Sequence, residues 1–416
     1  MIRSVCIWLV ILLMACSCSS GGDTSNTHQF RVFEEDGITI AETTGGPRYE
    51  GELFRYEESL VLHSDPAVEE SLLHRPSGMV ISDDGRIFIC DAGDRRIAVF
   101  SPAGEFIRNI GREGSGPGEF RYLNILGIHS GQLLIHDSSL NRLTVYSLEG
   151  ELQEVHTPRS LAGVNRFYPG PDDTFIGLDA TSKAVEPDFW QGMRALIVNS
   201  AGDTLVTVEA DPRPTSRMIS APLPVSFPVY YSDGPEFDYY PEQGILGYDS
   251  IDPELRWYDF TGAIQQIIRI GFPRELVTSA HRDRVKADWD DRIAVAGDAS
   301  RESMKAVREN LAYGEFVPFW RTATVDDTGY YWLQRYELRT ERLAAGGGSL
   351  FSLLSPDGEY LGDTRWPVSV TSGLWLLYPT ISQGCLVATI TDEETGEERV
   401  TVFSLKPAVD GLRYPY

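Results

Sequence analysis

The stretch Arg96–Gly104, RIAVFSPAG, indicates how the rest of the chain is organised. Its first five residues include β-branched and aromatic side chains that favour a strand, and the Ser-Pro-Ala-Gly that follows is typical of a tight turn. The same strand and turn return, with changes, at Arg142–Gly150, Arg194–Gly202, Glu254–Gly262, Leu350–Gly358 and from Arg399 onward. Six copies of one strand unit predict a radial array of small sheets.

The first full repeat begins near Pro76 and divides into four short strands. We expect these strands at Met79–Ser82, Arg86–Cys90, Arg96–Phe100 and Glu105–Ile110. Each turn between them contains the Gly, Asp or Pro that its backbone dihedral angles require. Four antiparallel strands that repeat about every 40 to 50 residues are typical of a propeller blade. We therefore predict an all-β fold, a six-bladed β-propeller made of four-stranded blades.

Short motifs accompany the first repeat. They are DAGDRRI at Asp91–Ile97, a turn glycine at Gly104, and GPGEF at Gly116–Phe120. This pattern resembles NHL repeats, and the resemblance is strongest over residues 76–150. It implies a bacterial lipoprotein that carries a six-bladed β-propeller of the NHL-repeat type.

An acidic residue and an arginine recur together in the repeats, as Asp91 with Arg96 and as Asp137 with Arg142. Groups that return in several blades are expected to serve the scaffold. We interpret both pairs as structural ion pairs or turn bonds within the blades. Contact with a ligand is the alternative interpretation.

The interval between the copies at Glu254 and Leu350 is about twice as long as the others. Residues 272–313 lack the alternation of a strand, and apolar residues from Val277 onward recur at a spacing near four. Pro273 suits the start of a helix. We predict a two-helix insertion at about 272–313 between blades four and five. A seventh, degenerate blade is the alternative.

Two further elements are expected at the N-terminal side of the propeller. In residues 30–52, apolar and polar residues alternate on either side of the turn signal Asp36-Gly37, which predicts a peripheral hairpin. Residues 53–63 predict a strand without a partner nearby in the sequence, whereas the last repeat lacks a clear fourth strand. We therefore expect strand 53–63 to complete blade six, so that the propeller spans residues 53–416.

The N-terminal residues predict export and anchoring. Residues 1–15 have a short basic start and an apolar stretch too short to span a bilayer, as in a signal peptide. The following Cys16 completes a motif that resembles the bacterial lipobox, which implies that Cys16 is lipidated; Cys18 is a less suitable site. Residues 16–29 form a flexible polar tether. Because Asp does not follow Cys16, the outer membrane of the cell envelope is favoured over the inner one.

The charge balance excludes some partners. The chain has 36 Lys and Arg against 61 Asp and Glu, a net charge of −25. Binding of nucleic acid and electrostatic docking on an anionic membrane both need clustered basic residues, so we expect neither. The protein is expected to be a monomer that contacts the membrane only through its lipid anchor. Cys90 and Cys385 are expected to be free buried thiols, with a disulfide between them as the alternative.

Candidate ligand-binding residues lie where the predicted blades begin, and these are Arg75, Arg121, Arg166, Arg321 and Arg365. If the blade starts meet near the propeller axis, their planar guanidinium groups provide a site for an anionic ligand. Stacking on an aromatic neighbour or pairing with Asp is the structural alternative. Tyr239 and Tyr240, in an insertion-like stretch, are candidates for stacking on a ligand, with packing on a blade edge as the alternative.

No catalytic residue, cofactor site or metal-ligand spacing is predicted, and the sequence has no Walker A, G-x-S-x-G or H-E-x-x-H motif. The leading hypothesis is a non-catalytic envelope lipoprotein whose propeller binds a partner protein, peptide or glycan. The chain also resembles propeller enzymes such as streptogramin lyase, lactonases and amidating lyases. The alternative is therefore a lyase or hydrolase with one divalent cation at the axis, near His74, His129 or His136.

Overall fold

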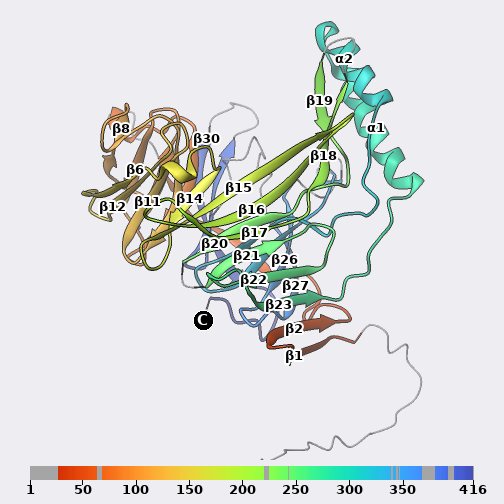
Figure 1. Ribbon diagram of the computed structural model, residues 1–416, viewed down its shortest axis with the longest axis horizontal. Coiled ribbons are helices and arrows are strands. Elements are labelled where there is room, and N and C mark those ends of the chain that lie inside the picture. Colours follow the sequence, from red (N-terminus) through yellow and green to blue (C-terminus); the bar gives the residue numbers. More distant parts are fainter. Residues whose placement is uncertain are drawn as a thin grey trace, which may run out of the picture.

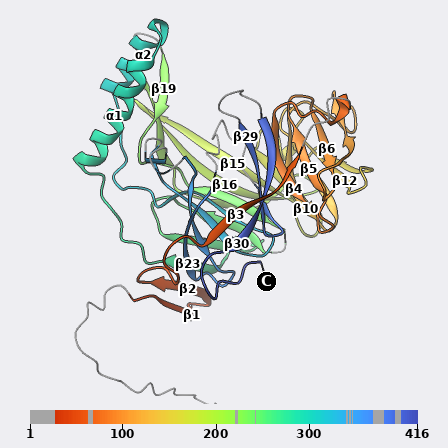
Figure 2. The ribbon, with the colours of Figure 1, turned by 180° about the vertical axis from the view of Figure 1, so that it is seen from behind.

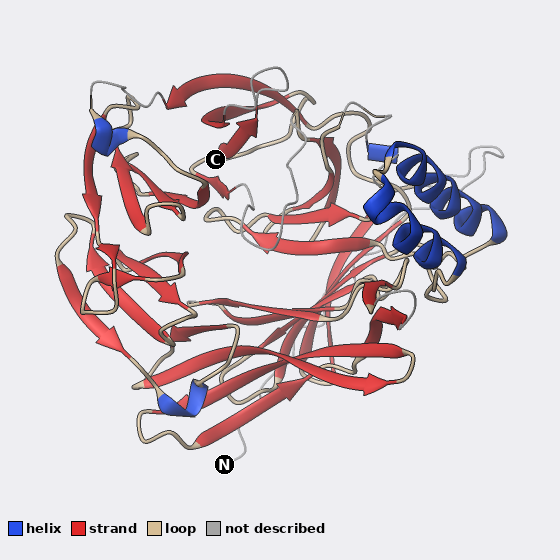
Figure 3. Cartoon of the chain, turned by 90° about the horizontal axis from the view of Figure 1, so that it is seen from above, coloured by secondary structure: helices blue, strands red, loops and turns tan. Residues whose placement is uncertain are grey.

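The protein is a ring of antiparallel sheets around one axis, which Figure 3 shows from above. The computed structural model describes residues 27–62, 68–219, 224–241, 243–338, 341–342, 345, 347–367, 380–391 and 398–415. Four of the sheets in the ring have four strands, and two have six because extra strands join them. The predicted six-bladed β-propeller is confirmed.

Blade one contains β4 (Pro76–Ile81), β5 (Ile87–Asp91), β6 (Arg96–Phe100) and β7 (Phe106–Ile110). Blade two contains β10 (Leu123–His129), β11 (Gln132–Asp137), β12 (Arg142–Ser147) and β13 (Leu152–His156). Blade three contains β14 (Arg166–Pro169), β15 (Thr174–Val185), β16 (Asp188–Asn199) and β17 (Thr204–Glu209). Between them lie a parallel pair, β8 (Arg112–Glu113) and β9 (Glu119–Phe120), and the short helices η2 (Glu69–Ser71) and η3 (Arg159–Leu161).

Blade four contains β20 (Glu236–Tyr240), β21 (Gly244–Tyr248), β22 (Glu254–Tyr258) and β23 (Ile264–Ile270). Blade five contains β24 (Trp320–Val325), β25 (Tyr331–Arg335), β26 (Leu350–Leu354) and β27 (Tyr360–Arg365). Blade six contains β28 (Thr380–Ser382), β29 (Cys385–Thr391), β30 (Glu398–Pro407) and β3 (Phe54–Leu62). The first strand of each blade is innermost, and β4 contacts the corresponding strands β10 and β28 of the neighbouring blades.

The backbone conformation explains why the strand unit recurs in the sequence. It is the third strand of blades one to five, and the glycine that ends each copy has a positive φ. These φ values are 82° at Gly104, 84° at Gly150, 95° at Gly202, 81° at Gly262 and 90° at Gly358. Because side chains with a Cβ atom rarely adopt this conformation, the tight turn to the outer strand selects glycine in each blade.

Apolar side chains fill the seams between blades, and each seam has its own buried cluster. The seam between blades six and one contains Leu62, Met79 and Val402, so the first and last blades pack like any other neighbours. β3 pairs antiparallel with β30, from Phe54 opposite Pro407 to Leu62 opposite Val400. An N-terminal strand therefore forms the outer edge of the C-terminal blade.

The N-terminal hairpin is less peripheral than the sequence suggested. β1 (Gln29–Glu35) and β2 (Ile38–Thr44) form the expected hairpin, but β2 also pairs in parallel with β23. Ile40 and Ala41 are buried against the blade. The hairpin thus extends blade four to six strands, because its apolar face has a blade edge to cover.

An arm whose strands were not predicted extends from blade three. β15 and β16 each have 12 residues, and β14 pairs only with the first part of β15. Beyond that point β16 pairs with β18 (Arg213–Ile219), which pairs with β19 (Val225–Pro228). Figures 1 and 2 show this arm and the hairpin β1–β2 at opposite ends of the molecule.

Two helices pack on the arm, within the predicted insertion between blades four and five. They are α1 (Ser279–Val295) and α2 (Asp298–Glu309). The first helix begins later than predicted, because Thr278 is its N-cap and accepts a hydrogen bond from the His281 backbone N–H, leaving Pro273 outside. The helices share a separate apolar cluster with the arm, which includes Phe227, Val285 and Trp289.

The signal peptide at 1–15, Cys16 and tether residues 16–26 lie outside the described residues. Within the described ranges, no helix has the length and apolar character needed to cross a membrane. Cys90 is buried in β5 and Cys385 is partly exposed at the start of β29, and both thiols are free.

Candidate functional site

The candidate site lies where the innermost strands of blades three, four and five begin. We name this side of the ring the start face. Arg166 is the first residue of β14, Glu236 is the first residue of β20, and Arg321 is the second residue of β24. Arg166 pairs in register with Leu178, so the later part of β15 continues past the start of β14. The arm therefore stands on the start face.

Strand alternation places the acidic groups of β20. Phe237 and Tyr239 are 2% and 5% exposed and pack into the seam between blades three and four. Because successive side chains of a strand point to opposite faces, Glu236 and Asp238 lie on the other face of β20. The loop before the strand adds a third carboxylate, that of Asp233.

Arg166 faces these carboxylates without forming a hydrogen bond. Its Nη1 lies 3.9 Å from Asp238 Oδ1, and the two side chains keep 36% and 26% of their exposure. Asp238 already accepts a hydrogen bond from the Tyr239 backbone N–H. Within the described part of the chain, the Arg166 guanidinium has no hydrogen-bond partner, so its donors are available to a ligand.

Glu236 has an unusual protonation equilibrium. Burial raises the pKa of its carboxyl group from 4.5 to about 7, although the nearby Arg166 opposes the rise and Asp238 and Asp233 add to it. Among the described residues, none forms a hydrogen bond or ion pair with the Glu236 side chain. A carboxyl group in this state can take up or release a proton near neutral pH.

Asp233 and Arg321 continue the site toward blade five. Asp233 Oδ2 is buried without a hydrogen-bond partner, and burial raises the pKa of this carboxyl group while Arg321 lowers it. The Arg321 guanidinium lies over the Tyr336 ring, 4.5 Å from its centroid. It is exposed, and no described residue forms a hydrogen bond or ion pair with it. We name Arg166, Asp233, Glu236, Asp238 and Arg321 the axial cluster.

The other predicted arginines have different positions. Arg121 Nε donates to Ser115 Oγ at 2.8 Å. Arg365 ends the outer strand β27 instead of opening blade six, and it donates two hydrogen bonds to Glu337. Arg75 is exposed before β4, with φ at 64°, and among the described residues it forms no hydrogen bond or ion pair with the axial cluster. Of the five predicted arginines, the structure brings Arg166 and Arg321 to the cluster.

The two predicted tyrosines belong to a strand, not to an insertion loop. Tyr239 donates its hydroxyl hydrogen to the Pro169 carbonyl at 3.2 Å and is buried. The Tyr240 hydroxyl accepts the Val325 backbone N–H at 2.8 Å. The stretch that resembled an insertion is β20, and its tyrosines tie blade four to blades three and five. Both rings therefore pack between blades, which is the structural alternative given for them.

The repeated acid and arginine pairs differ between the first two blades. Arg96 Nε lies 3.3 Å from Asp91 Oδ2, which is the predicted ion pair. Arg142 instead donates to the carbonyls of Ser115, Gly116 and Glu119, and no ion pair with Asp137 occurs in this described region. Asp137 accepts backbone N–H groups from Arg121, Tyr122 and Leu140. Arg142 and Asp137 therefore each form hydrogen bonds that stabilise turns, as the interpretation as turn bonds predicted.

Within the described ranges, His74, His129 and His136 do not come together in one group of possible metal ligands. Among the described residues, one group of three possible ligands is close together, His74, Asp91 and Asp94, within 4.8 Å of one another. It lies in blade one, and Arg96 already pairs with both carboxylates. His136 is 2% exposed, and burial lowers the pKa of its ring to about 4. In the part of the chain that the structure describes, the carboxylates of Asp233, Glu236 and Asp238 do not form a second group of three this close together.

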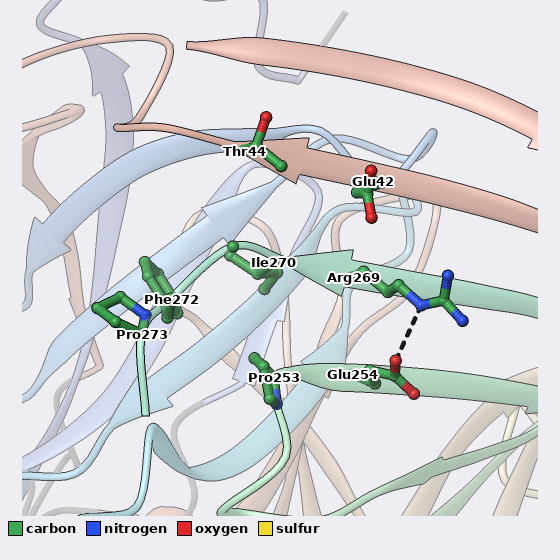
Figure 4. Close-up of a pocket in the computed structure, with 9 residues that line it drawn as sticks. Glu42, Thr44, Pro253, Glu254, Arg269, Ile270, Phe272 and Pro273 are labelled. Carbon is green, nitrogen blue, oxygen red and sulfur yellow. Dashed lines mark hydrogen bonds and ion pairs between the residues drawn. The ribbon is translucent and has the colours of Figure 1, made fainter. Parts of the chain in front are cut away.

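A surface groove of about 320 Å³ lies at the outer side of blade four (Figure 4). Glu42 and Thr44 of β2 line one side, and Glu254, Arg269 and Phe272 line the other. Arg269 Nε donates to Glu254 Oε1 at 2.9 Å, and Glu42 accepts from Arg31. Because its charged groups already pair with one another, the groove offers less to a polar ligand than the axial cluster does.

Glu236, Asp238 and Asp233 were not among the predicted site residues. Their signal was the stretch SDGPEFDYY, in which acidic and aromatic residues alternate. Alternation of this kind indicates a strand with one apolar and one polar face. Glu236 and Asp238 lie on that polar face of β20.

Comparisons with known proteins agree with this architecture. A family model described as a six-bladed β-propeller, DUF5128, matches residues 68–210, about a third of the chain. No curated protein matches the sequence. With the strands described above, this match defines the chain as a six-bladed β-propeller.

Three solved structures illustrate the likeness. A Bacteroides fragilis protein that is described as exported has 12% identity and a TM-score of 0.47, over 86% of this chain and 95% of that one. A catalytically inactive virginiamycin B lyase from Staphylococcus aureus has 11% identity and a TM-score of 0.40, over 85% and 100%. A PQQ-bound aldose sugar dehydrogenase from Streptomyces coelicolor has 13% identity and a TM-score of 0.38, over 87% of this chain and 100% of that one. At these values the likeness carries no argument about activity.

Proposed function

We propose that the protein is a non-catalytic recognition protein of the bacterial cell envelope, whose propeller binds a peptide segment or glycan of a partner at the axial cluster. The observation that carries this proposal is the unused hydrogen-bonding capacity of Arg166, Arg321 and Glu236. Charged groups in a partly buried site are normally paired, and groups left unpaired in the free protein are available to a ligand.

Arginines elsewhere in the chain provide the contrast. Several donate two hydrogen bonds to one carboxylate of the scaffold, and these are Arg194, Arg213, Arg217, Arg308 and Arg365. Arg166 and Arg321 lack such partners among the described residues. They come from different blades, so a ligand that contacts both is held by the ring as a rigid frame.

The proposed location of the protein in the envelope rests on Cys16. It lies in the lipobox-like motif at the N-terminus, and we propose that it carries a lipid that holds the propeller at the outer membrane of the envelope. The polar tether that follows allows the propeller to reach a partner beyond the membrane surface.

Binding of defined probes to the mature chain tests the proposal. Two probes represent the two ligand classes: the peptide acetyl-Ala-Lys-Ala with a free carboxylate, and maltotriose. We expect calorimetric binding of at least one probe, and loss of that binding by about tenfold or more in the double variant Arg166→Gln, Arg321→Gln.

Arg112→Gln is the matched control, because Arg112 is an arginine with an 80% exposed side chain outside the cluster. Its binding should equal that of the wild type. Failure of both probes to bind the wild-type chain, or equal binding by the double variant, would contradict the proposal.

A lyase or hydrolase is the second candidate function, and the Glu236 carboxyl group favours it. A group whose pKa is about 7 has the protonation equilibrium that a general acid or base needs. If the protein is an enzyme, Glu236→Gln should retain ligand binding and abolish turnover of the bound ligand. The divalent cation of this alternative is tested by metal analysis of the purified protein, with a stoichiometric metal as the outcome in its favour.

A further inference from the structure

Two carboxylates of the axial cluster have no donor to satisfy them. Asp233 Oδ2 is buried without a partner, and the Glu236 side chain forms no hydrogen bond with any residue that the structure describes. A buried carboxylate oxygen without a donor destabilises the protein, because it has lost water and gained nothing in return. A donor supplied by a ligand would remove this cost.

The arginines of the cluster do not supply that donor. Arg166 approaches Asp238 at 3.9 Å and Arg321 lies on the Tyr336 ring, so Arg166 acts on Glu236, and Arg321 on Asp233, only electrostatically. Three carboxylates face two guanidinium groups, which leaves one negative charge uncompensated when all of them are ionised. The cluster therefore favours a ligand group that is positively charged and rich in donors.

The backbone holds Asp233 in place. The Ser250 hydroxyl donates to the Asp233 carbonyl oxygen at 2.9 Å, and the Phe319 N–H donates to the Ser250 carbonyl at 2.7 Å. Ser250 is 1% exposed. These bonds from Ser250 and from the residue before β24 fix the backbone position of Asp233 in the loop before β20.

We infer that Asp233 and Glu236 form a subsite for a primary ammonium group, while Arg166 and Arg321 bind an acceptor of the same ligand. The inference rests on the proposed function and narrows it to amine-bearing peptides, such as one with a free lysine side chain, in preference to neutral glycans. An ammonium group has three donors and one positive charge, so it can satisfy both carboxylates together. A sugar hydroxyl brings no charge.

Such a subsite responds to pH. An ammonium group binds the ionised form of Glu236, and the pKa of this carboxyl group is about 7 in the free protein. The charged groups that act on it are Arg166 of β14, Asp238 of its own strand and Asp233 of the preceding loop. Below pH 7, binding must release the Glu236 proton, so affinity should rise about tenfold for each pH unit up to 7.

A matched pair of peptides tests the inference on the mature chain. The first is acetyl-Ala-Lys-Ala with a free carboxylate, and the second is the same peptide with its lysine side chain acetylated. We expect the acetylated peptide to bind about tenfold or more weakly, because it lacks the ammonium group but keeps the carboxylate. Calorimetry in two buffers at pH 6 should also register release of a proton when the first peptide binds.

Two variants separate the subsite from the rest of the cluster. Asp233→Asn and Glu236→Gln preserve shape and remove charge, so each should abolish the preference for the ammonium group, and a normal circular dichroism spectrum should establish folding. Equal binding of the two peptides, when that binding still depends on Arg166 and Arg321, would overturn the inference and leave the proposed function standing. Absence of binding by both peptides and by maltotriose would overturn both.

Discussion

Replacement of Glu236 by Gln should make the folded protein more stable at alkaline pH. Burial holds the pKa of this carboxyl group at about 7 in the folded chain, compared with 4.5 for an ordinary glutamate. Between these values the unfolded chain has released the proton and the folded chain still holds it. Because the folded state binds more protons, raising the pH through this window favours unfolding.

The size of the effect follows from the two pKa values. Their separation corresponds to about 3 kcal/mol across the whole window, at 1.36 kcal/mol for each pH unit. The pI of about 4.6 makes work below pH 5 impractical because net charge then approaches zero. Between pH 5.5 and pH 8, wild-type protein should lose about 2 kcal/mol of unfolding free energy relative to Glu236→Gln.

Denaturant unfolding at pH 5.5, 6.5, 7.5 and 8, followed by tryptophan fluorescence, measures this difference. Glu113→Gln is the control, because the Glu113 side chain is 67% exposed and its loss should shift stability equally at each pH. If the stabilities of wild type and Glu236→Gln change in parallel from pH 5.5 to pH 8, Glu236 is not a buried group that titrates near neutrality, and the reasoning fails.

Three further predictions concern the scaffold and its anchor. Tyr414→Phe removes the 2.8 Å hydrogen bond to the buried Asp326 carboxylate and should lower unfolding free energy by about 1–2 kcal/mol; an unchanged denaturation midpoint would contradict this. Arg142→Met removes three bonds to the carbonyls of the loop before Phe120, so hydrogen exchange in that loop should accelerate while exchange in blade five stays constant. Cys16→Ala should move the protein from the membrane fraction to the soluble envelope fraction; retention in the membrane would exclude Cys16 as the lipid anchor.

The ring could be predicted from sequence because its unit repeats. Each copy must turn sharply from its third to its outer strand, so glycine recurs at positions such as Gly104 and Gly262. The repeat does not predict side-chain partners, because Arg96 and Arg142 have the same place in the pattern but different partners. Residue type and spacing specify a strand position, whereas the partner of a long side chain depends on the local loops.

The axial cluster could be predicted only in part. Arg166 and Arg321 were found because a blade start places a residue near the axis, but the same reasoning selected Arg365, which ends an outer strand. Glu236 escaped notice because its stretch resembled a loop. Carboxylates on an innermost strand conflict with the apolar pattern expected there, and such conflicts are frequent at functional sites.

The pairing of β3 with β30 also determines when the protein can fold. The Ser59 hydroxyl bonds to the Val402 carbonyl, which lies 343 residues further along the chain. A ribosome makes β3 long before its partner, so blade six cannot form until almost the whole polypeptide has emerged. A fold that its last strands complete therefore leaves the earlier blades without their closing neighbour until synthesis is nearly finished.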